Sequence, residues 1–303
     1  MRYSRVIPAI LAAGALGLVA SSSTDVSAST RNEQSSLSRT FPVVREAGPG
    51  AEQYTAYYPA DPKAVGHDLP IVVFGNGACN HASDIEYITT LELVASHGFL
   101  VVSEGYYAGA PAGVSNAPDP SLLTKAIDWA QAQDRAHGSD LRHHVDTSSI
   151  AVAGHSCGGI EALVAGEDPR VDAVLALDTG FFPTSAPFGY GRDELAKLHS
   201  PVLFLDGGPD DIAYENSVAN YGLVTVPAIH ATNPDAGHAG FWHNTRKMQW
   251  DMTLTPEAAT VIVQFLDLAL YGNQGADAYF RGAHPGLAAV PGWSVESKDF
   301  PTS

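Results

Sequence analysis

Cysteine is scarce in this sequence. The chain of 303 residues has only two, Cys79 and Cys157, and one disulfide at most cannot make a cysteine-stapled scaffold. Stability must therefore come from buried apolar side chains, and a hydrophobic content of 45% is enough for a sizeable core. The length suits one large domain or two small ones, and no repeat or linker divides the chain.

Basic residues are scarce as well. There are 16 Lys and Arg against 33 Asp and Glu, which gives a formal net charge of −17. This balance argues against nucleic acid and against anionic membrane surfaces as main partners. Charged residues are only 16% of the chain, so the acidic excess does not make it a polyelectrolyte.

Long hydrophobic runs are missing except near the start. Residues 6–20 form an apolar run, Arg2 and Arg5 precede it, and the small residues 26–28 follow it. The run is shorter than the ~20 residues that a membrane span needs. The pattern therefore predicts a secretory signal peptide over residues 1–28.

The predicted signal peptide sets the expected organisation of the chain. Residues 29–39 are polar and are predicted to be a disordered segment, and one folded domain is predicted over residues 40–303. We expect a protein that is secreted to the extracellular space and has no membrane span.

Apolar runs and helical patterns alternate along the rest of the chain. Short apolar runs predict strands buried on both faces, at residues 69–74, 99–103, 150–153, 171–177 and 201–205. Apolar residues at helical spacing predict helices, at residues 85–97, 121–136, 159–165 and, as the final helix, 256–271. Residues 53–59 alternate like an edge strand. This order predicts an α/β fold with a doubly wound, mostly parallel sheet and helices on both faces.

A Gly-x-Ser-x-Gly motif stands between a predicted strand and a predicted helix. It runs from Gly154 to Gly158 and has Ser156 at its centre. The glycines permit a tight strand-to-helix turn with the serine at the apex, in strained dihedrals. A serine hydroxyl is a poor nucleophile at neutral pH, so Ser156 needs a base and an orienting acid.

Three aspartates qualify as the orienting acid. Where a Gly-x-Ser-x-Gly motif forms the turn between a strand and a helix, the acid follows the serine and precedes the histidine in the chain. Asp206, Asp210 and Asp211 all come after the strand at 201–205. Asp206 is the least suitable because it stands right at the strand end.

The base is expected in a loop before the last helix. His238 lies in the stretch Gly-His-Ala-Gly at 237–240, which makes it the best candidate. His230 and His243 are its competitors.

These motifs resemble the α/β-hydrolase superfamily. More narrowly, they resemble an exported bacterial and fungal group near the dienelactone hydrolase, chlorophyllase and cutinase-like polyester hydrolase branches. The matching stretches are colinear: FGNGAC at 74–79, SHGFLVV at 96–102, GHSCGG at 154–159, GGPDDIAY at 207–214 and GHAG at 237–240. The resemblance implies the α/β-hydrolase fold.

The resemblance also implies roles for individual residues. Relatives tend to have a serine where this chain has Asp210, which favours Asp211 as the acid and keeps Asp210 as the alternative. The oxyanion hole would consist of the backbone N–H groups of Cys157 and Ala78. If these two groups converge on one oxygen, Cys79 and Cys157 lie on adjacent loops, and in an exported protein they are expected to form a disulfide.

Other polar and aromatic residues give weaker signals. Glu161 is predicted to be a helix cap or a surface group, and the adjacent histidines at 143–144 do not suit a metal site. Aromatic residues near the expected carboxyl edge could line a substrate pocket: Tyr106, Tyr107, Phe181 and Trp242, with Phe182 and Phe241.

Together these features predict a secreted serine hydrolase that cleaves carboxylic esters through an acyl-enzyme. The short segment between residues 177 and 201 leaves little or no room for a lid, which suits bulky or polymeric esters. We expect a monomer that needs no metal and no organic cofactor. The alternatives are an amide hydrolase or acyltransferase with the same triad, and a non-catalytic binding protein on a hydrolase scaffold.

Overall fold

The computed structural model describes residues 41–242 and 253–300. The predicted signal peptide, the segment 29–39 and the competitor His243 lie outside the described residues, so those expectations remain predictions.

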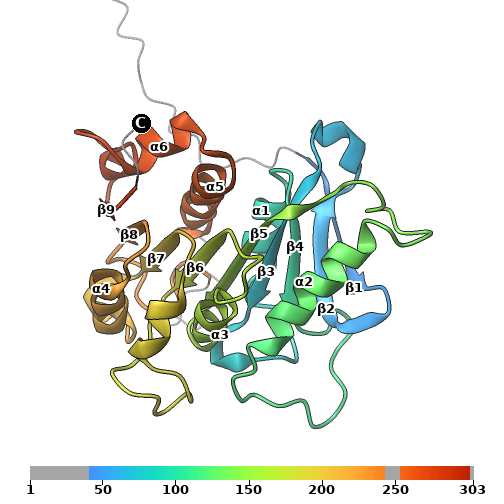
Figure 1. Ribbon diagram of the computed structural model, residues 1–303, viewed down its shortest axis with the longest axis horizontal. Coiled ribbons are helices and arrows are strands. Elements are labelled where there is room, and N and C mark those ends of the chain that lie inside the picture. Colours follow the sequence, from blue (N-terminus) through green and yellow to red (C-terminus); the bar gives the residue numbers. More distant parts are fainter. Residues whose placement is uncertain (1–40, 243–252, 301–303) are drawn as a thin grey trace, which may run out of the picture. The chain divides into compact units, whose positions relative to one another are not determined.

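Within the described residues, nine strands form one sheet in the order β1-β2-β4-β3-β5-β6-β7-β8-β9 (Figure 1). The strands from β4 to β8 are parallel, and every pairing that involves β1, β2 or β9 is antiparallel. The strands are β1 (Val43–Gly48), β2 (Ala51–Pro59), β3 (Leu69–Gly75), β4 (Leu100–Glu104), β5 (Val145–His155), β6 (Ala173–Leu177), β7 (Val202–Asp206), β8 (Ala228–Thr232) and β9 (Ser294–Lys298).

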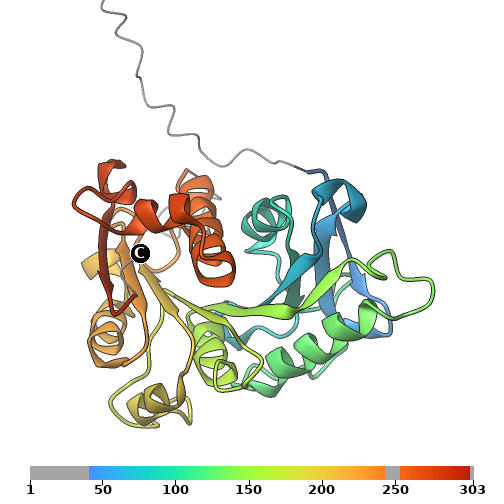
Figure 2. The ribbon, with the colours of Figure 1, turned by 45° about the horizontal axis from the view of Figure 1, so that its top comes forward.

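Helices cover both faces of the sheet, as predicted (Figure 2). On one face, α2, α3 and α4 enclose a core with the sheet, and on the other face α1, α5 and α6 enclose a second core. The sheet is buried between them, which explains why β3, β6 and β7 read as continuous apolar runs. The helices are α1 (Ile88–Ala95), α2 (Ser121–Gln133), α3 (Cys157–Ala165), α4 (Tyr214–Leu223), α5 (Thr255–Tyr271) and α6 (Gln274–Phe280).

Two predictions about the sheet margins were wrong. The stretch 53–59 belongs to β2, which is not an edge strand, because β1 pairs with its outer side. The helix α5, predicted as the final helix, is followed by α6 and then by β9. Three strands were missed. The strands β1 and β9 are partly exposed margins of the sheet that carry charged residues, and such strands lack a strong apolar signal. The strand β8 is buried, but His230 and Thr232 interrupt its short apolar run.

The parallel strands bring four connecting segments to one edge of the sheet. Ser156 directly follows β5, the loop after β7 contains Asp211, and the loop after β8 contains His238. The fourth segment, the 3-10 helix η2 (Gly77–Cys79), follows β3. In open α/β sheets, ligands bind outside the carboxyl ends of the strands.

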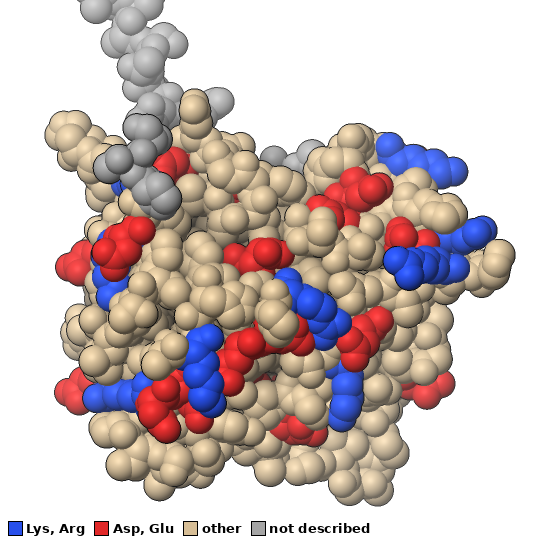
Figure 3. Space-filling model, in the orientation of Figure 1, with Lys and Arg blue, Asp and Glu red and all other residues tan. Residues whose placement is uncertain are grey.

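The connection from β6 to β7 leaves this edge uncovered by any lid domain. Residues 178–201 are all described, and they contain only the short 3-10 helix η3 (Arg192–Lys197). In the described part of the chain, no helix is both long and apolar enough to cross a membrane. On the face shown in Figure 3, acidic and basic side chains are interspersed with wide neutral areas.

Candidate active site

Ser156 lies in a strained turn between β5 and α3. Its φ of 53° and ψ of −117° fall outside the regions that L residues ordinarily adopt. Glycines make the turn possible. A Cβ on Gly154 would lie 2.1 Å from the carbonyl oxygen of Gly158, and a Cβ on Gly158 would lie 2.2 Å from the carbonyl carbon of Gly75. The ends of β3 and β5 and the start of α3 therefore meet through backbone atoms.

The structure brings together Ser156, His238 and Asp211. The Nε2 atom of His238 is 2.9 Å from Ser156 Oγ, and its Nδ1 atom is 2.6 Å from Asp211 Oδ1. The side chain of His238 is 24% exposed, whereas that of Asp211 is fully buried. This geometry can take a proton from the serine and hold the imidazole in one tautomer.

The environment of Asp211 favours its charged form. Burial alone would raise the pKa of this carboxyl group, but the hydrogen bonds from His238 and from the Ala213 N–H, 2.8 Å away, outweigh burial and lower the pKa. Asp210, the alternative acid, has an exposed side chain. Asp211 is therefore the aspartate that contacts the histidine.

The other two competitors form a pair of their own. The Nε2 atom of His230, on β8, lies 2.6 Å from Asp206 Oδ2 at the end of β7. Both side chains are buried. Asp206 and His230 are thus partners of each other.

The loop after β3 has an unusual backbone. Ala78 and Cys79 have positive φ angles of 57° and 46°, which non-glycine residues rarely adopt. The Gly158 N–H donates to the Asn76 carbonyl oxygen at 3.1 Å and so ties this loop to the start of α3. Cys157 is the first residue of α3, where N–H groups have no intrahelical acceptor. Ala78 is the middle residue of the single-turn segment η2 and has non-helical dihedrals. We call residues 76–79 the oxyanion loop, after the role that the family resemblance implies for Ala78.

The disulfide prediction is confirmed. Cys79 and Cys157 are bonded to each other, and their Cα atoms are 5.1 Å apart. The bond connects the oxyanion loop to the first residue of α3, directly after Ser156.

The fold and these contacts agree with a family match. A family model described as PET hydrolase-like matches residues 20–224, about two thirds of the chain. The chain belongs to the PET hydrolase-like family. This places it among ester hydrolases of the α/β-hydrolase superfamily, in line with the resemblance to polyester hydrolases. No curated protein matches the chain.

The family match covers only part of the candidate site. Ser156 and Asp211 lie within the matched residues, whereas His238 lies beyond them. The placement of His238 in this PET hydrolase-like chain therefore rests on its own contacts with Ser156 and Asp211.

A small apolar cavity opens beside Ser156 in this member of the family. Its volume is about 90 Å³, and its walls include Ile160, Phe182, Phe188 and Ile212. A larger depression of about 640 Å³ shares Phe182 and Ile212 with the cavity. The Ile212 side chain is 83% exposed and lies between the two, whereas the walls of the depression also include the charged residues Arg192 and Glu215.

Of the aromatic residues expected to line the pocket, Phe182 does so and the others do not. Phe181 is fully buried in one core and Trp242 in the other. Tyr107 packs against the guanidinium of Arg45. None of these three residues lines the cavity, and Tyr106 does not line it either. Phe182, the neighbour of Phe181, does line it. The sequence could not tell which ring of this pair faces the core.

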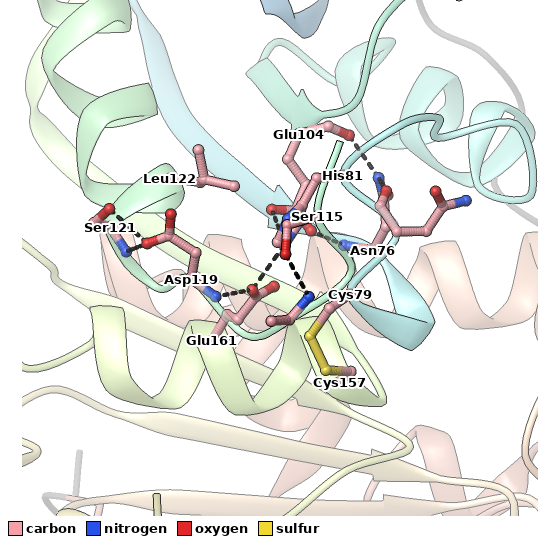
Figure 4. Close-up of polar contacts among 12 residues, drawn as sticks. Asn76, Cys79, His81, Glu104, Ser115, Asp119, Ser121, Leu122, Cys157 and Glu161 are labelled. Atoms are coloured by element: carbon pink, nitrogen blue, oxygen red, sulfur yellow. Dashed lines mark hydrogen bonds and ion pairs between the residues drawn. A yellow bond between two sulfur atoms is a disulfide. The ribbon is translucent and has the colours of Figure 1, made fainter. Parts of the chain in front are cut away.

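Glu161 is neither a cap nor a surface group, contrary to the prediction. It is fully buried, and its Oε1 atom accepts hydrogen bonds from His81 Nε2 at 2.9 Å and from the Asp119 N–H at 2.7 Å (Figure 4). Glu104 Oε2 lies 3.5 Å from the same His81 nitrogen. The only signal in the sequence was a lone glutamate in an otherwise apolar helix.

This cluster has some features of a metal site. Donor atoms of Cys79, His81 and Glu161 lie within 4.8 Å of one another. However, the Cys79 sulfur is bonded in the disulfide, so it is not a thiolate ligand. The His81 nitrogen and the Glu161 oxygen already form a hydrogen bond. The donor set therefore fits a buried hydrogen-bond network better than a metal centre.

Proposed function

We propose that this member of the PET hydrolase-like family is a secreted serine hydrolase that cleaves carboxylic esters. The observation that carries the proposal is the unbroken path from Asp211 through His238 to Ser156, with contacts of 2.6 and 2.9 Å. The path ends on a serine at the apex of a strained turn, where the hydroxyl can reach a substrate.

In the acylation half-reaction, Ser156 Oγ attacks the ester carbonyl carbon and its proton passes to His238 Nε2. Asp211 stabilises the resulting imidazolium. The carbonyl oxygen becomes an oxyanion, to which the N–H groups of Ala78 and Cys157 donate. When the tetrahedral intermediate collapses, the C–O bond to the alcohol breaks, the alcohol takes the proton from His238, and an acyl-serine remains.

Deacylation repeats these steps with water. His238 takes a proton from a water molecule, whose oxygen attacks the acyl carbon. The carboxylic acid leaves as Ser156 recovers its proton. The steps balance with the residues present and one water molecule.

The cavities suggest which part of the ester lies where. A cavity of about 90 Å³ suits a short acyl chain or a single ring beside Phe182 and Phe188, whose ring centroids are 5.8 Å apart. The adjoining depression has room for the remainder of a longer molecule. Together with the absence of a lid domain over the described residues 178–201, this arrangement favours short-acyl and polymeric esters.

The test is hydrolysis of p-nitrophenyl esters from acetate to palmitate, together with release of soluble acid from a polyester film. We expect an optimum at short acyl chains. Ser156→Ala should lower kcat by roughly 10⁴–10⁶-fold, whereas Ser148→Ala, at an exposed serine, should leave it unchanged. Activity that survives Ser156→Ala would remove this serine from the mechanism.

The proposal includes export and one folded domain over residues 40–303. The disulfide supports export, because disulfides persist mainly in oxidising compartments. Expression in a secreting bacterial host should deliver a chain that begins at Ser29. N-terminal sequencing of the protein from the medium checks this, and an intact N-terminus found only inside the cells would contradict it.

A further inference from the structure

A second chain of hydrogen bonds runs behind the triad. The Gly77 N–H donates to the Tyr87 hydroxyl at 2.8 Å, and that hydroxyl lies 2.8 Å from His155 Nδ1. The other nitrogen of this ring, His155 Nε2, lies 2.8 Å from the carbonyl oxygen of His238. The chain thus connects the oxyanion loop, the residue before Ser156 and the backbone of the catalytic histidine.

The chemistry of these groups fixes the direction of each bond. A carbonyl oxygen only accepts, so His155 Nε2 must carry a proton and donate it to His238. In a neutral imidazole, Nδ1 is then an acceptor, and the Tyr87 hydroxyl donates to it. The Tyr87 oxygen is left to accept from Gly77. All three hydrogen bonds of this series therefore run in one direction, from Gly77 through Tyr87 and His155 to His238.

The surroundings hold the two side chains in place. Tyr87 is 2% and His155 is 5% exposed. The Trp242 ring packs against both, with ring centroids 5.6 Å from Tyr87 and 5.5 Å from His155. A buried hydrogen bond of this kind is strong, and its loss leaves a partner unsatisfied.

Asp178 is an acidic residue beside His155, and the pKa of its carboxyl group is raised. Its Oδ2 atom lies 3.5 Å from His155 Nε2 and accepts a hydrogen bond from Trp242 Nε1 at 3.1 Å. Burial, together with the nearby charges of Asp211 and Asp206, raises the pKa of Asp178 well above its ordinary value. The raised pKa makes a negative charge on Asp178, beside His155, less favourable.

We propose that Tyr87 and His155 are positioning residues that set the relative placement of the oxyanion loop and His238. This inference rests on the proposed function. The His238 side chain reaches Ser156 and Asp211. The glycines of its loop make backbone hydrogen bonds, from Gly237 N–H to the Gly207 carbonyl oxygen and from Gly240 N–H to the Ala236 carbonyl oxygen. The bond from His155 fixes the main chain of His238 itself, while the bond from Tyr87 fixes the residue before Ala78.

The consequence of losing this chain is misplacement of reacting groups rather than loss of any of them. A shift of about 1 Å in a catalytic group lowers the rate by about 100-fold. The substrate cavity does not include Tyr87 or His155, so substrate binding should change little. The expected signature is a lower kcat with an almost unchanged KM.

Two substitutions of His155 separate its two bonds. A glutamine amide reaches about as far as the imidazole Nε2 and can still donate to the His238 carbonyl, whereas an asparagine amide reaches only the position of Nδ1. We expect His155→Asn and Tyr87→Phe to lower kcat by about 10–100-fold, and His155→Gln to stay closer to the wild type than His155→Asn.

Tyr54→Phe is the matched control for Tyr87→Phe. Tyr54 is 1% exposed and donates one hydrogen bond, to the Leu122 carbonyl oxygen at 2.8 Å, away from the site. It should lose stability without losing kcat. All variants are assayed with p-nitrophenyl acetate well below their Tm, beside the wild type and Ser156→Ala.

The outcomes distinguish the two proposals. Full activity in Ser156→Ala would overturn the proposed function. An inactive Ser156→Ala combined with wild-type kcat in Tyr87→Phe and His155→Asn would overturn only the positioning role. If these variants fail to fold, nitrogen-15 NMR of the wild type decides: a proton on His155 Nε2 supports the directed chain, and a neutral ring protonated on Nδ1 overturns it.

Discussion

Two buried polar networks hold the oxyanion loop from adjacent residues, and they are built differently. At Gly77 the network consists of Tyr87 and His155, each with one donor matched to one acceptor. At Asn76 the backbone N–H donates to Glu104 Oε1 at 2.7 Å. Behind Glu104 lie His81 and Glu161, so this second network contains two carboxyl groups and an imidazole (Figure 4).

The two networks differ in the free energy that burial of their groups costs. When neutral groups are buried, hydrogen bonds inside the protein replace their hydrogen bonds to water, so their burial costs little free energy. Burial of carboxylates costs much more, and Glu104 Oε2 and Glu161 Oε2 have no hydrogen-bond partner among the described residues. Burial, with Glu161 as neighbour, raises the pKa of Glu104 well above its ordinary value. The first network should therefore govern geometry, and the second should govern stability and its dependence on pH.

The largest effect on stability should follow from Glu161→Ala. It removes the acceptor of both His81 Nε2 and the Asp119 N–H and leaves these groups buried without it. We expect a loss of about 3–5 kcal/mol in the free energy of unfolding, measured by denaturant titration. Glu52→Ala, at an exposed glutamate, should change it by less than about 0.5 kcal/mol. A similarly small loss for Glu161→Ala would mean that the carboxyl network carries no stability.

Removal of the disulfide should come next, because it joins the two regions that the networks serve. Cys79→Ala with Cys157→Ala opens a link between residues 78 positions apart, and the unfolded chain gains conformational entropy. We expect a loss of about 2–4 kcal/mol in the free energy of unfolding. The wild type under a reductant should match the double variant. If the reductant lowers the free energy of unfolding of the double variant as much as that of the wild type, the disulfide does not cause the loss.

Tyr87→Phe should have a smaller effect on stability than Glu161→Ala. It leaves the Gly77 N–H and His155 Nδ1 without the hydroxyl, at a cost of about 1–3 kcal/mol. The comparison predicts that this variant loses more activity per kcal/mol of stability than Glu161→Ala does. Denaturant titration and kcat on the same samples give both quantities. Equal ratios would erase the distinction between the two networks.

The smallest effect is expected from Glu104→Gln, which tests whether the free energy of unfolding falls or rises with pH. With a raised pKa, the folded chain keeps a proton that the unfolded chain releases above about pH 4.5, the ordinary Glu value. Wild-type stability from this group therefore falls as pH rises. Glutamine cannot titrate, so the stability of the variant relative to the wild type should improve from pH 5 to pH 8. A difference that stays constant with pH would rule out a protonated Glu104.

The sequence predicted the parts of the molecule that follow a period or a motif. Buried parallel strands read as apolar runs, and the glycines around Ser156 mark a turn that few other residues allow. The assignment of Asp211 and the disulfide came from a family resemblance. The residues alone left Asp206, Asp210 and Asp211 open, because all three come after the predicted strand at 201–205.

What the sequence did not predict depends on which way single side chains face. Tyr87 and His155 are ordinary residues in their segments until the fold places them in contact. Glu161 and His81 are 80 positions apart, and no local pattern connects them. The choice between Phe181 and Phe182 as a cavity wall depends on the turn of a non-periodic segment, for which neither the helical nor the strand period applies.

The disulfide between Cys79 and Cys157 also has a consequence for when the chain becomes stable. It closes a ring that contains α1, β4, α2 and β5 and so links the loop after β3 to the end of β5. If the chain is exported as proposed, this ring stays open in the reducing cytoplasm, where the chain is easier to unfold for translocation, and oxidation closes the ring after the chain has crossed. For a chain exported as proposed, resistance to unfolding would thus be acquired at the destination.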